Sequence, residues 1–255
     1  MFLKLDGQFI MKKDKSDSSA VLLRGKISSF ERSRRSHDFL MTKVQHQQIG
    51  ATAIGASAMG MGAASIGLIG MAGNSDEEAD WVEFEIDGKK IQGWLWMMPM
   101  RNGDNVEVVA EKLGHDRYVA YAVKRDKDDL LAVYPHATAG RRVHYRKSLK
   151  AWMWWVAIGH LFILLSFIMQ LGWRVILEPD MHFAFSLIFP ICSTMCAVIA
   201  LRVSLKLMPF VEIAEIIFKT FGWSDIKNID LRKTSKENRR ENTLPNFGTF
   251  YFRYK

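Results

Sequence analysis

Residues 151–173 read AWMWWVAIGHLFILLSFIMQLGW and contain no Asp, Glu, Lys or Arg. As an α-helix this run would rise about 34 Å, enough to cross the hydrocarbon core of a bilayer. A second uncharged run, MHFAFSLIFPICSTMCAVIAL at residues 181–201, follows after a connection too short for anything but a hairpin. The alternative is a pair of buried helices in a large soluble core. We favour a two-helix transmembrane hairpin, which occupies residues 141–207.

Tryptophans lie at both ends of the first predicted span. Trp152, Trp154 and Trp155 are near its beginning, and Trp173 closes it. Tryptophan is enriched where a membrane meets water, because its ring is apolar and its N–H group is polar. We therefore expect these four residues to anchor the hairpin at the two interfaces.

Basic residues gather on the two long flanks of the predicted hairpin. The connecting loop has one cation, which Glu178 and Asp180 oppose. Because cytoplasmic flanks carry the excess of Lys and Arg, we expect a multi-pass protein of the inner (cytoplasmic) membrane with both termini in the cytoplasm. The cations are Arg141, Arg142, Arg146, Lys147 and Lys150 before the first span, Arg202 and Lys206 after the second, and Arg174 in the loop.

Polar residues and a proline interrupt the two runs. His160 and Gln170 either line a water path or bond to the second helix, or they are single polar residues absorbed by their apolar surroundings, which we favour. Pro190 predicts a kink in the second helix. Cys192 and Cys196 are best explained as small packing residues, and they form no disulfide framework.

Residues 49–73, IGATAIGASAMGMGAASIGLIGMAG, form a third uncharged segment. Ala56, Gly60 and Ala64 recur every four residues, and Gly67 follows Ala63 at the same spacing, a pattern that lets helices approach closely in a bilayer. The segment is less apolar than the two spans. We favour a buried or oligomerising helix, and conditional insertion into a membrane or a flexible loop are the alternatives.

Alternating apolar and polar residues predict a β-rich domain over residues 20–140, into which residues 49–73 are inserted. Val82, Phe84 and Ile86 alternate with acidic residues, and Asp87-Gly88 is a strong hairpin turn. Five to seven short strands with tight turns indicate a small OB-like β-barrel. We thus predict an α+β membrane protein, with a polar N-terminal segment at residues 1–19 and no secretory signal peptide there.

The net charge of +8 and the pI near 9.4 favour an anionic partner. Trp94, Trp96, Tyr118 and Tyr121 could stack on nucleic-acid bases, but aromatic residues at this spacing are more often core residues. The positive charge gathers instead near the spans and in residues 208–255, which suits the anionic lipid of a bilayer better than nucleic acid. There we predict an amphipathic helix that lies along the membrane interface, followed by a basic tail.

No catalytic signature is present. The sequence has no H-E-x-x-H and no G-x-S-x-G, and its histidines are scattered in polar surroundings. The two cysteines have too few neighbouring ligand types for a metal site. We therefore expect no enzyme, no catalytic residues and no metal or other cofactor.

Several stretches together resemble a bacterial family of type VI secretion system effectors. They are SHDFLMT at residues 36–42, EEADWVEFEIDGKKIQGWLW at 77–96, NGDNVEVVAE at 102–111 and VYPHATAGRR at 133–142, followed by a tryptophan-rich hairpin. The resemblance implies an antibacterial toxin that is delivered to a target cell membrane and disrupts it. It further implies a secretion-apparatus component and a cognate immunity protein as partners, and a homo-oligomer would fit permeabilisation.

A resident inner-membrane protein is the alternative function. Its barrel would bind a ligand or a protein in the cytoplasm, as in an immunity or anti-phage factor. The asymmetric distribution of basic residues supports it, because a resident protein depends on such a signal for its orientation. Gene context and the phenotype on expression discriminate between the two functions.

Overall fold

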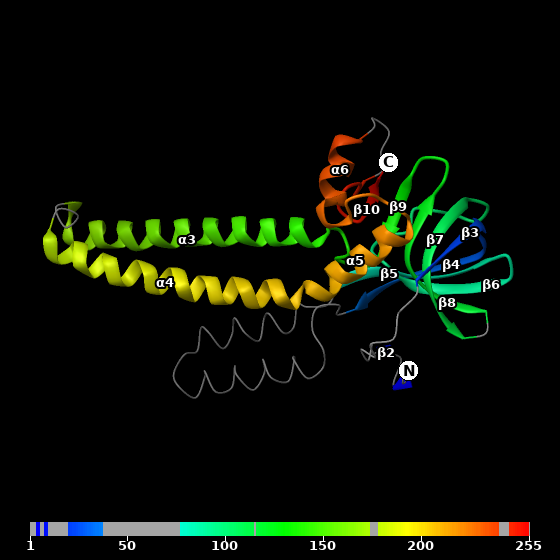
Figure 1. The fold of residues 1–255 in the computed structure, drawn as a ribbon, viewed down its shortest axis with the longest axis horizontal. Helices are drawn as coiled ribbons and strands as arrows, with labels where there is room; N and C mark the ends of the chain where they lie inside the picture. Colours follow the sequence, from blue (N-terminus) through cyan, green and yellow to red (C-terminus); the bar gives the residue numbers. More distant parts are fainter. Residues whose placement is uncertain are drawn as a thin grey trace.

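The computed structural model describes residues 4–5, 8–9, 20–37, 77–114, 116–173, 178–239 and 245–254. The glycine- and alanine-rich segment with Ala56, Gly60, Ala64 and Gly67 lies outside the described residues. The described part is α+β, as predicted: a mixed β-sheet is accompanied by four α-helices. A β-rich domain lies at one end, and two long helices project from it side by side (Figure 1).

The main sheet has the hydrogen-bonded order β10-β9-β8-β6-β5-β4, with β7 paired to both β8 and β3. Strand β8 is at the centre of the sheet. Along one edge β8 pairs with β7, and along its other edge it pairs first with β6 and then with β9. The β6–β8 pair is parallel, whereas the neighbouring pairs are antiparallel. The strands are β3 (Val21–Lys26), β4 (Ser28–His37), β5 (Glu77–Ile86), β6 (Lys89–Leu95), β7 (Asn105–Gly114), β8 (Arg117–Arg125), β9 (Leu130–Val133) and β10 (Tyr251–Arg253), with a separate pair β1 (Lys4–Leu5) and β2 (Gln8–Phe9).

Two turns arise directly from local sequence. Asp87 and Gly88 both have positive φ, 49° and 77°, so they form the tight connection between β5 and β6 that the Asp-Gly pair predicts. Gly103 has φ 91° in the turn before β7. Only glycine adopts such an angle without strain, so Asn102-Gly103 forms a turn between the segment after β6 and the start of β7.

The domain has two apolar cores, one on each face of the sheet. The first contains Val82, Phe84 and Ile86 from β5, the residues whose alternation predicts this strand. The second lies between the sheet and helix α5 (Met208–Thr220). Its members include Val109, Ala122, Leu131, Val133, Ala214, Ile217, Phe218, Leu231 and Phe252.

The expected position of the amphipathic helix at a membrane interface is wrong. The apolar face of α5, with Ala214, Ile217 and Phe218 fully buried, packs on the sheet. A helix with one apolar stripe has the same periodicity whether the stripe faces lipid or a sheet. Packing on the sheet removes each large side chain from water, which stabilises by roughly 1.5–3 kcal/mol apiece.

The predicted basic tail is also folded in its described parts. Helix α6 (Leu231–Glu237) follows a short 3₁₀ turn, η2 (Ile226–Asn228), and β10 adds a strand beside β9. The backbone N–H of Arg253 donates to the hydroxyl of Ser235, and the Arg253 guanidinium donates to the carbonyl oxygen of Asp128. The C-terminal residues therefore complete the domain that residues 20–37 begin.

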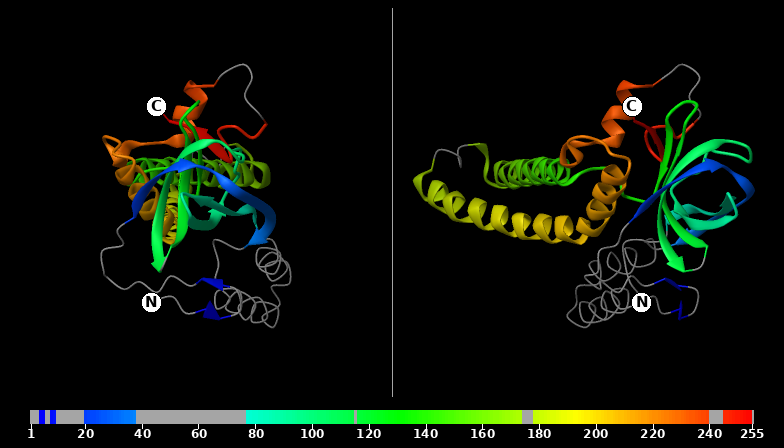
Figure 2. Two further views of the ribbon diagram at one scale, coloured as in Figure 1. Left: turned by 90° about the vertical axis from the view of Figure 1, so that its right-hand side faces the viewer. Right: turned by 45° about the vertical axis from the view of Figure 1, so that its right-hand side comes forward.

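Both ends of the helical hairpin are fixed to this domain. Before helix α3 (Arg141–Leu171), Gly140 donates to the carbonyl of Ile229 at 2.9 Å, and Thr138 accepts from Leu231 at 3.0 Å. After helix α4 (Pro179–Lys206), Leu207 leads directly into the buried α5. The right-hand view in Figure 2 shows the C-terminal segments, in orange and red, between the sheet and the hairpin base.

Candidate functional site: the helical hairpin and its groove

Helices α3 and α4 are long and apolar enough to cross a membrane, and the described part of the chain leaves them uncovered. They have 31 and 28 residues, which correspond to about 46 and 42 Å of helical rise. No residue in the most apolar window of either helix is buried. Among the large exposed side chains are Trp154 and Trp155, each 70% exposed, and Phe162, 71% exposed. An exposed apolar surface of this extent is typical of a site that contacts a membrane or another protein.

Local sequence sets the ends of the hairpin. Gly172 has φ 81° and its N–H donates to the carbonyl of Ile168, so α3 ends at a backbone angle that residues other than glycine rarely adopt. Helix α4 begins with Pro179 in its first turn, where a missing N–H group costs nothing, and Asp180 complements the helix dipole there. The helix continues through Pro190 to Lys206 along a curved path (Figure 2).

His160 joins the two helices near the middle of the hairpin. Its Nε2 lies 3.1 Å from the carbonyl oxygen of Phe189 and 3.2 Å from the hydroxyl of Ser193. The Ser193 hydroxyl donates to the same carbonyl at 2.8 Å, and the indole N–H of Trp152 donates to the carbonyl of Ser193. These contacts cluster beside Pro190. His160 therefore bonds to the second helix, whereas Gln170 is exposed near the far end of α3.

A second polar contact closes the base of the hairpin. The Nε2 of His144 lies 3.1 Å from the carbonyl oxygen of Ser204 and 3.0 Å from its hydroxyl. Ser148 donates to the same hydroxyl at 3.3 Å. Ser204 is the one buried residue among the described side chains of α4. This serine contact was missed from the sequence, although serine is a small residue that lets helices approach closely.

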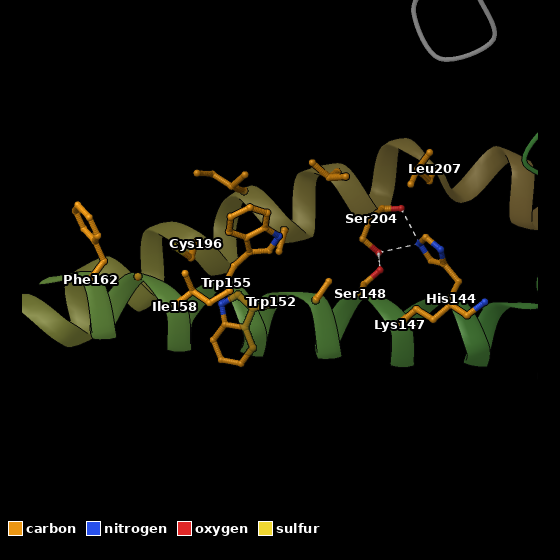
Figure 3. A pocket seen from close by; sticks show the side chains of 15 residues that line it. His144, Lys147, Ser148, Trp152, Trp155, Ile158, Phe162, Cys196, Ser204 and Leu207 are labelled. Atoms are coloured by element: carbon orange, nitrogen blue, oxygen red, sulfur yellow. Dashed lines mark hydrogen bonds between the residues drawn. The ribbon is translucent and has the colours of Figure 1, made fainter. Parts of the chain in front are cut away.

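A groove of about 840 Å³ runs between α3 and α4 from this polar base toward the middle of the hairpin (Figure 3). His144, Lys147, Ser148 and Ser204 line its base, and apolar side chains line the remainder. The groove is therefore amphipathic along its length. Its apolar part is formed by Ala151, Trp152, Trp155, Ile158, Gly159, Phe162, Cys196, Ile199, Ala200, Val203 and Leu207.

The four predicted interface anchors lie in the first half of α3 and just beyond its last turn. Trp154 and Trp155 are exposed 13 and 14 residues after Arg141, the first residue of α3, and Trp173, 64% exposed, follows the last turn. By helical rise about 27 Å separates Trp155 from Trp173, close to the thickness of a hydrocarbon core. Trp152 differs from the others because it is half-buried and bonded to α4.

The buried ionisable groups of the β-rich domain are paired within the fold. Asp80, 1% exposed, accepts from Arg34 and from the backbone N–H of Met98. Burial, followed by the hydrogen bond to Glu111, raises the pKa of Tyr121 above its ordinary value. Burial alone raises the pKa of Tyr134 to about 12. Both phenols stay protonated at neutral pH and serve the core beside α5.

The described residues also bear on the stacking and metal hypotheses. Trp96, Tyr118 and Tyr121 are buried, so they offer no platform for bases, and Trp94 packs edge-on against Trp81. Within the ranges that the structure describes, no three His, Cys, Asp or Glu side chains come together as a metal site would need.

No family model, curated protein or solved structure matches this chain. The resemblance to secreted effectors therefore stays a prediction from the sequence.

Proposed function

We propose that this chain is an integral membrane protein in which α3 and α4 cross a bilayer as a hairpin. The observation that carries this proposal is the contrast between the two parts: the domain has two buried cores, whereas the hairpin exposes apolar side chains along its whole length. The tryptophans in the first half of α3 and after its last turn support the same placement, as do the cations at its base.

The proposed orientation places the β-rich domain in the cytoplasm and the loop before α4 on the other side. Both hairpin ends are fixed to one domain, so the flanks share a side.

We also propose that the domain is an OB-like barrel. In support, β3 pairs with β7 and β4 pairs with β5, and only Ile27 separates β3 from β4 in the chain. One bent strand would thus close the barrel.

Single cysteines test the orientation. In a Cys192→Ala, Cys196→Ala background we expect a membrane-impermeant maleimide to label Glu178→Cys in intact cells. Lys127→Cys and Ser224→Cys should react only after the cells are permeabilised, because both positions belong to the domain. Labelling of Lys127→Cys and Ser224→Cys on opposite sides would contradict the two-span hairpin.

Within this class we propose a membrane-active antibacterial effector of a type VI secretion system that permeabilises a target membrane. The hairpin supplies two helices, and two helices enclose no pore, so permeabilisation requires several copies. The exposed faces of α3 and α4 and the small-residue pattern at residues 49–73 support such an assembly.

Induced expression in a sensitive bacterium tests this activity. We expect growth arrest together with loss of membrane potential, read with a potential-sensitive dye. The matched control is the same chain with Leu161→Arg and Ile191→Arg, which should not insert and should not depolarise the cells. Normal growth and a normal membrane potential in cells that are confirmed to express the wild-type chain would refute the effector function.

The second candidate is a resident inner-membrane protein with a cytoplasmic barrel that binds a ligand or protein. The observation that favours it is the basic flank of α3, which orients a protein inserted by its own cell. An adjacent toxin gene, with protection rather than killing on expression, would support this candidate over the effector.

A further inference from the structure

A basic depression lies where the hairpin meets the C-terminal part of the domain. It has a volume of about 490 Å³. Among the described residues, four cationic side chains line it, and Asp230 is the one carboxylate in that lining. The basic depression consists of Lys147, Asp230, Arg232, Lys233, Lys236, Gly248 and Thr249.

The fold holds two of these cations in place. The Nζ of Lys147 lies 2.7 Å from Oδ2 of Asp230, and the guanidinium of Arg232 lies 5.5 Å from the ring centre of the buried Trp96. Glu237 adds a second negative charge nearby, 3.8 Å from Lys233. In the described part of the chain, four positive charges thus face two negative ones. The excess favours an anionic ligand, and preformed cations lose less freedom when they bind it.

The basic depression and the hairpin groove share Lys147. On α3 this lysine precedes Trp154 by about 11 Å of helical rise. If the tryptophans mark the edge of the hydrocarbon, Lys147 lies at the level of the lipid headgroups. A cation at this level attracts anionic lipid.

The groove continues from Lys147 into apolar surroundings. From Trp155 to Phe162 it follows α3 for about 11 Å, which is within the roughly 15 Å depth of one leaflet. The groove is open at Gly159, which has no side chain: a Cβ built there would have no neighbour within 4 Å. The lining is thus charged at the headgroup level and apolar below it, which is the polarity of a phospholipid.

We propose that the basic depression and the groove together bind one anionic glycerophospholipid. Its phosphate would lie among Lys147, Arg232 and Lys236, and an acyl chain would follow Trp155 and Phe162. This inference rests on the proposed crossing of the bilayer, because only there does the groove open onto lipid. The bound lipid would then join the hairpin to the domain.

Native mass spectrometry of the full chain in detergent micelles tests the headgroup site. The probe is an equimolar mixture of phosphatidylglycerol and phosphatidylcholine with identical acyl chains. We expect wild type to retain phosphatidylglycerol preferentially. In the triple variant Arg232→Gln, Lys233→Gln, Lys236→Gln, which changes exposed residues, the ratio of retained phosphatidylglycerol to retained phosphatidylcholine should fall at least about tenfold. The charge-matched control Lys90→Gln, Lys112→Gln, Lys127→Gln changes exposed lysines elsewhere on the domain and should retain it.

A second pair of variants tests the apolar part. Gly159→Leu places an isobutyl group in the groove, and its Cβ would meet no atom within 4 Å, whereas Ala157→Leu creates the same side chain at an exposed position outside the lining. We expect Gly159→Leu to retain less phosphatidylglycerol than wild type and Ala157→Leu to match wild type. Displacement of the lipid by soluble glycerol phosphate alone would overturn the role of the groove.

Alkaline extraction of cell membranes separates this inference from the proposed function. All these variants should stay in the membrane pellet, because none adds a charge to a span. Equal retention of the two lipids by an inserted wild type, or equal losses in the triple variant and its control, would refute the lipid site alone. A wild type released from the membrane would refute both proposals.

Discussion

Gly140→Ala is expected to destabilise the domain by about 3 kcal/mol or more. Gly140 has φ −75°, so its backbone conformation suits any residue. The reason is space: a Cβ would lie 2.1 Å from the carbonyl oxygen of Ile226 and 2.7 Å from the carbonyl carbon of Lys227. These are backbone atoms, so the hairpin base and the C-terminal segment would have to separate.

Chemical denaturation in detergent, followed by tryptophan fluorescence, measures this loss. Gly159→Ala is the matched control, because it makes the same exchange in α3 where the added Cβ meets no atom within 4 Å. The control should be as stable as wild type or slightly more stable, since alanine favours a helix over glycine by about 1 kcal/mol. A Gly140→Ala variant within 1 kcal/mol of wild type would show that this junction is loosely packed.

Local patterns sufficed for much of the fold. The two uncharged runs predicted α3 and α4, and the alternation around Phe84 with its Asp87-Gly88 turn predicted the β5–β6 hairpin. In each case the sequence pattern that predicts the element lies entirely within residues that are neighbours in the chain. A bilayer-length run or a two-residue turn needs no distant partner to be recognised.

Non-local pairings could not be predicted in the same way. The parallel β6–β8 pair and the addition of β10 to β9 join segments that are far apart in the sequence. The apolar stripe of α5 was visible, but its partner was not, because lipid and sheet select the same periodicity. Phe252 looked like part of a basic tail, and only the fold shows it fully buried.

Only the part of the candidate site that depends on local sequence could be predicted. His160 stood out as a polar residue in an apolar run, whereas Ser204 and the basic depression did not. The depression combines Lys147 from α3 with side chains of α6, which lies more than 80 residues further along the chain. Such a cluster exists only after the C-terminal segment has folded back on the hairpin base.

Leu161→Arg combined with Ile191→Arg is expected to prevent membrane insertion. Both residues lie at the centres of the proposed spans, and they are 56% and 60% exposed. An arginine at the centre of a membrane helix costs roughly 2.5–3.5 kcal/mol, so two cost roughly 5–7 kcal/mol and outweigh much of the apolar gain. In a water-exposed helix pair the same arginines would be harmless or would improve solubility. The double variant therefore separates a bilayer environment from an aqueous one.

The measurement is the fraction of protein that stays with the membrane after alkaline carbonate extraction. Wild type and the apolar control Leu161→Ile, Ile191→Leu should remain in the pellet, whereas the arginine variant should be released or degraded. The domain should still fold, because neither position contributes to its two buried cores. Circular dichroism with a preserved β-sheet signal in the released protein would show this. A double-arginine variant that resists extraction as wild type does would contradict the prediction that Leu161 and Ile191 lie in the hydrocarbon core.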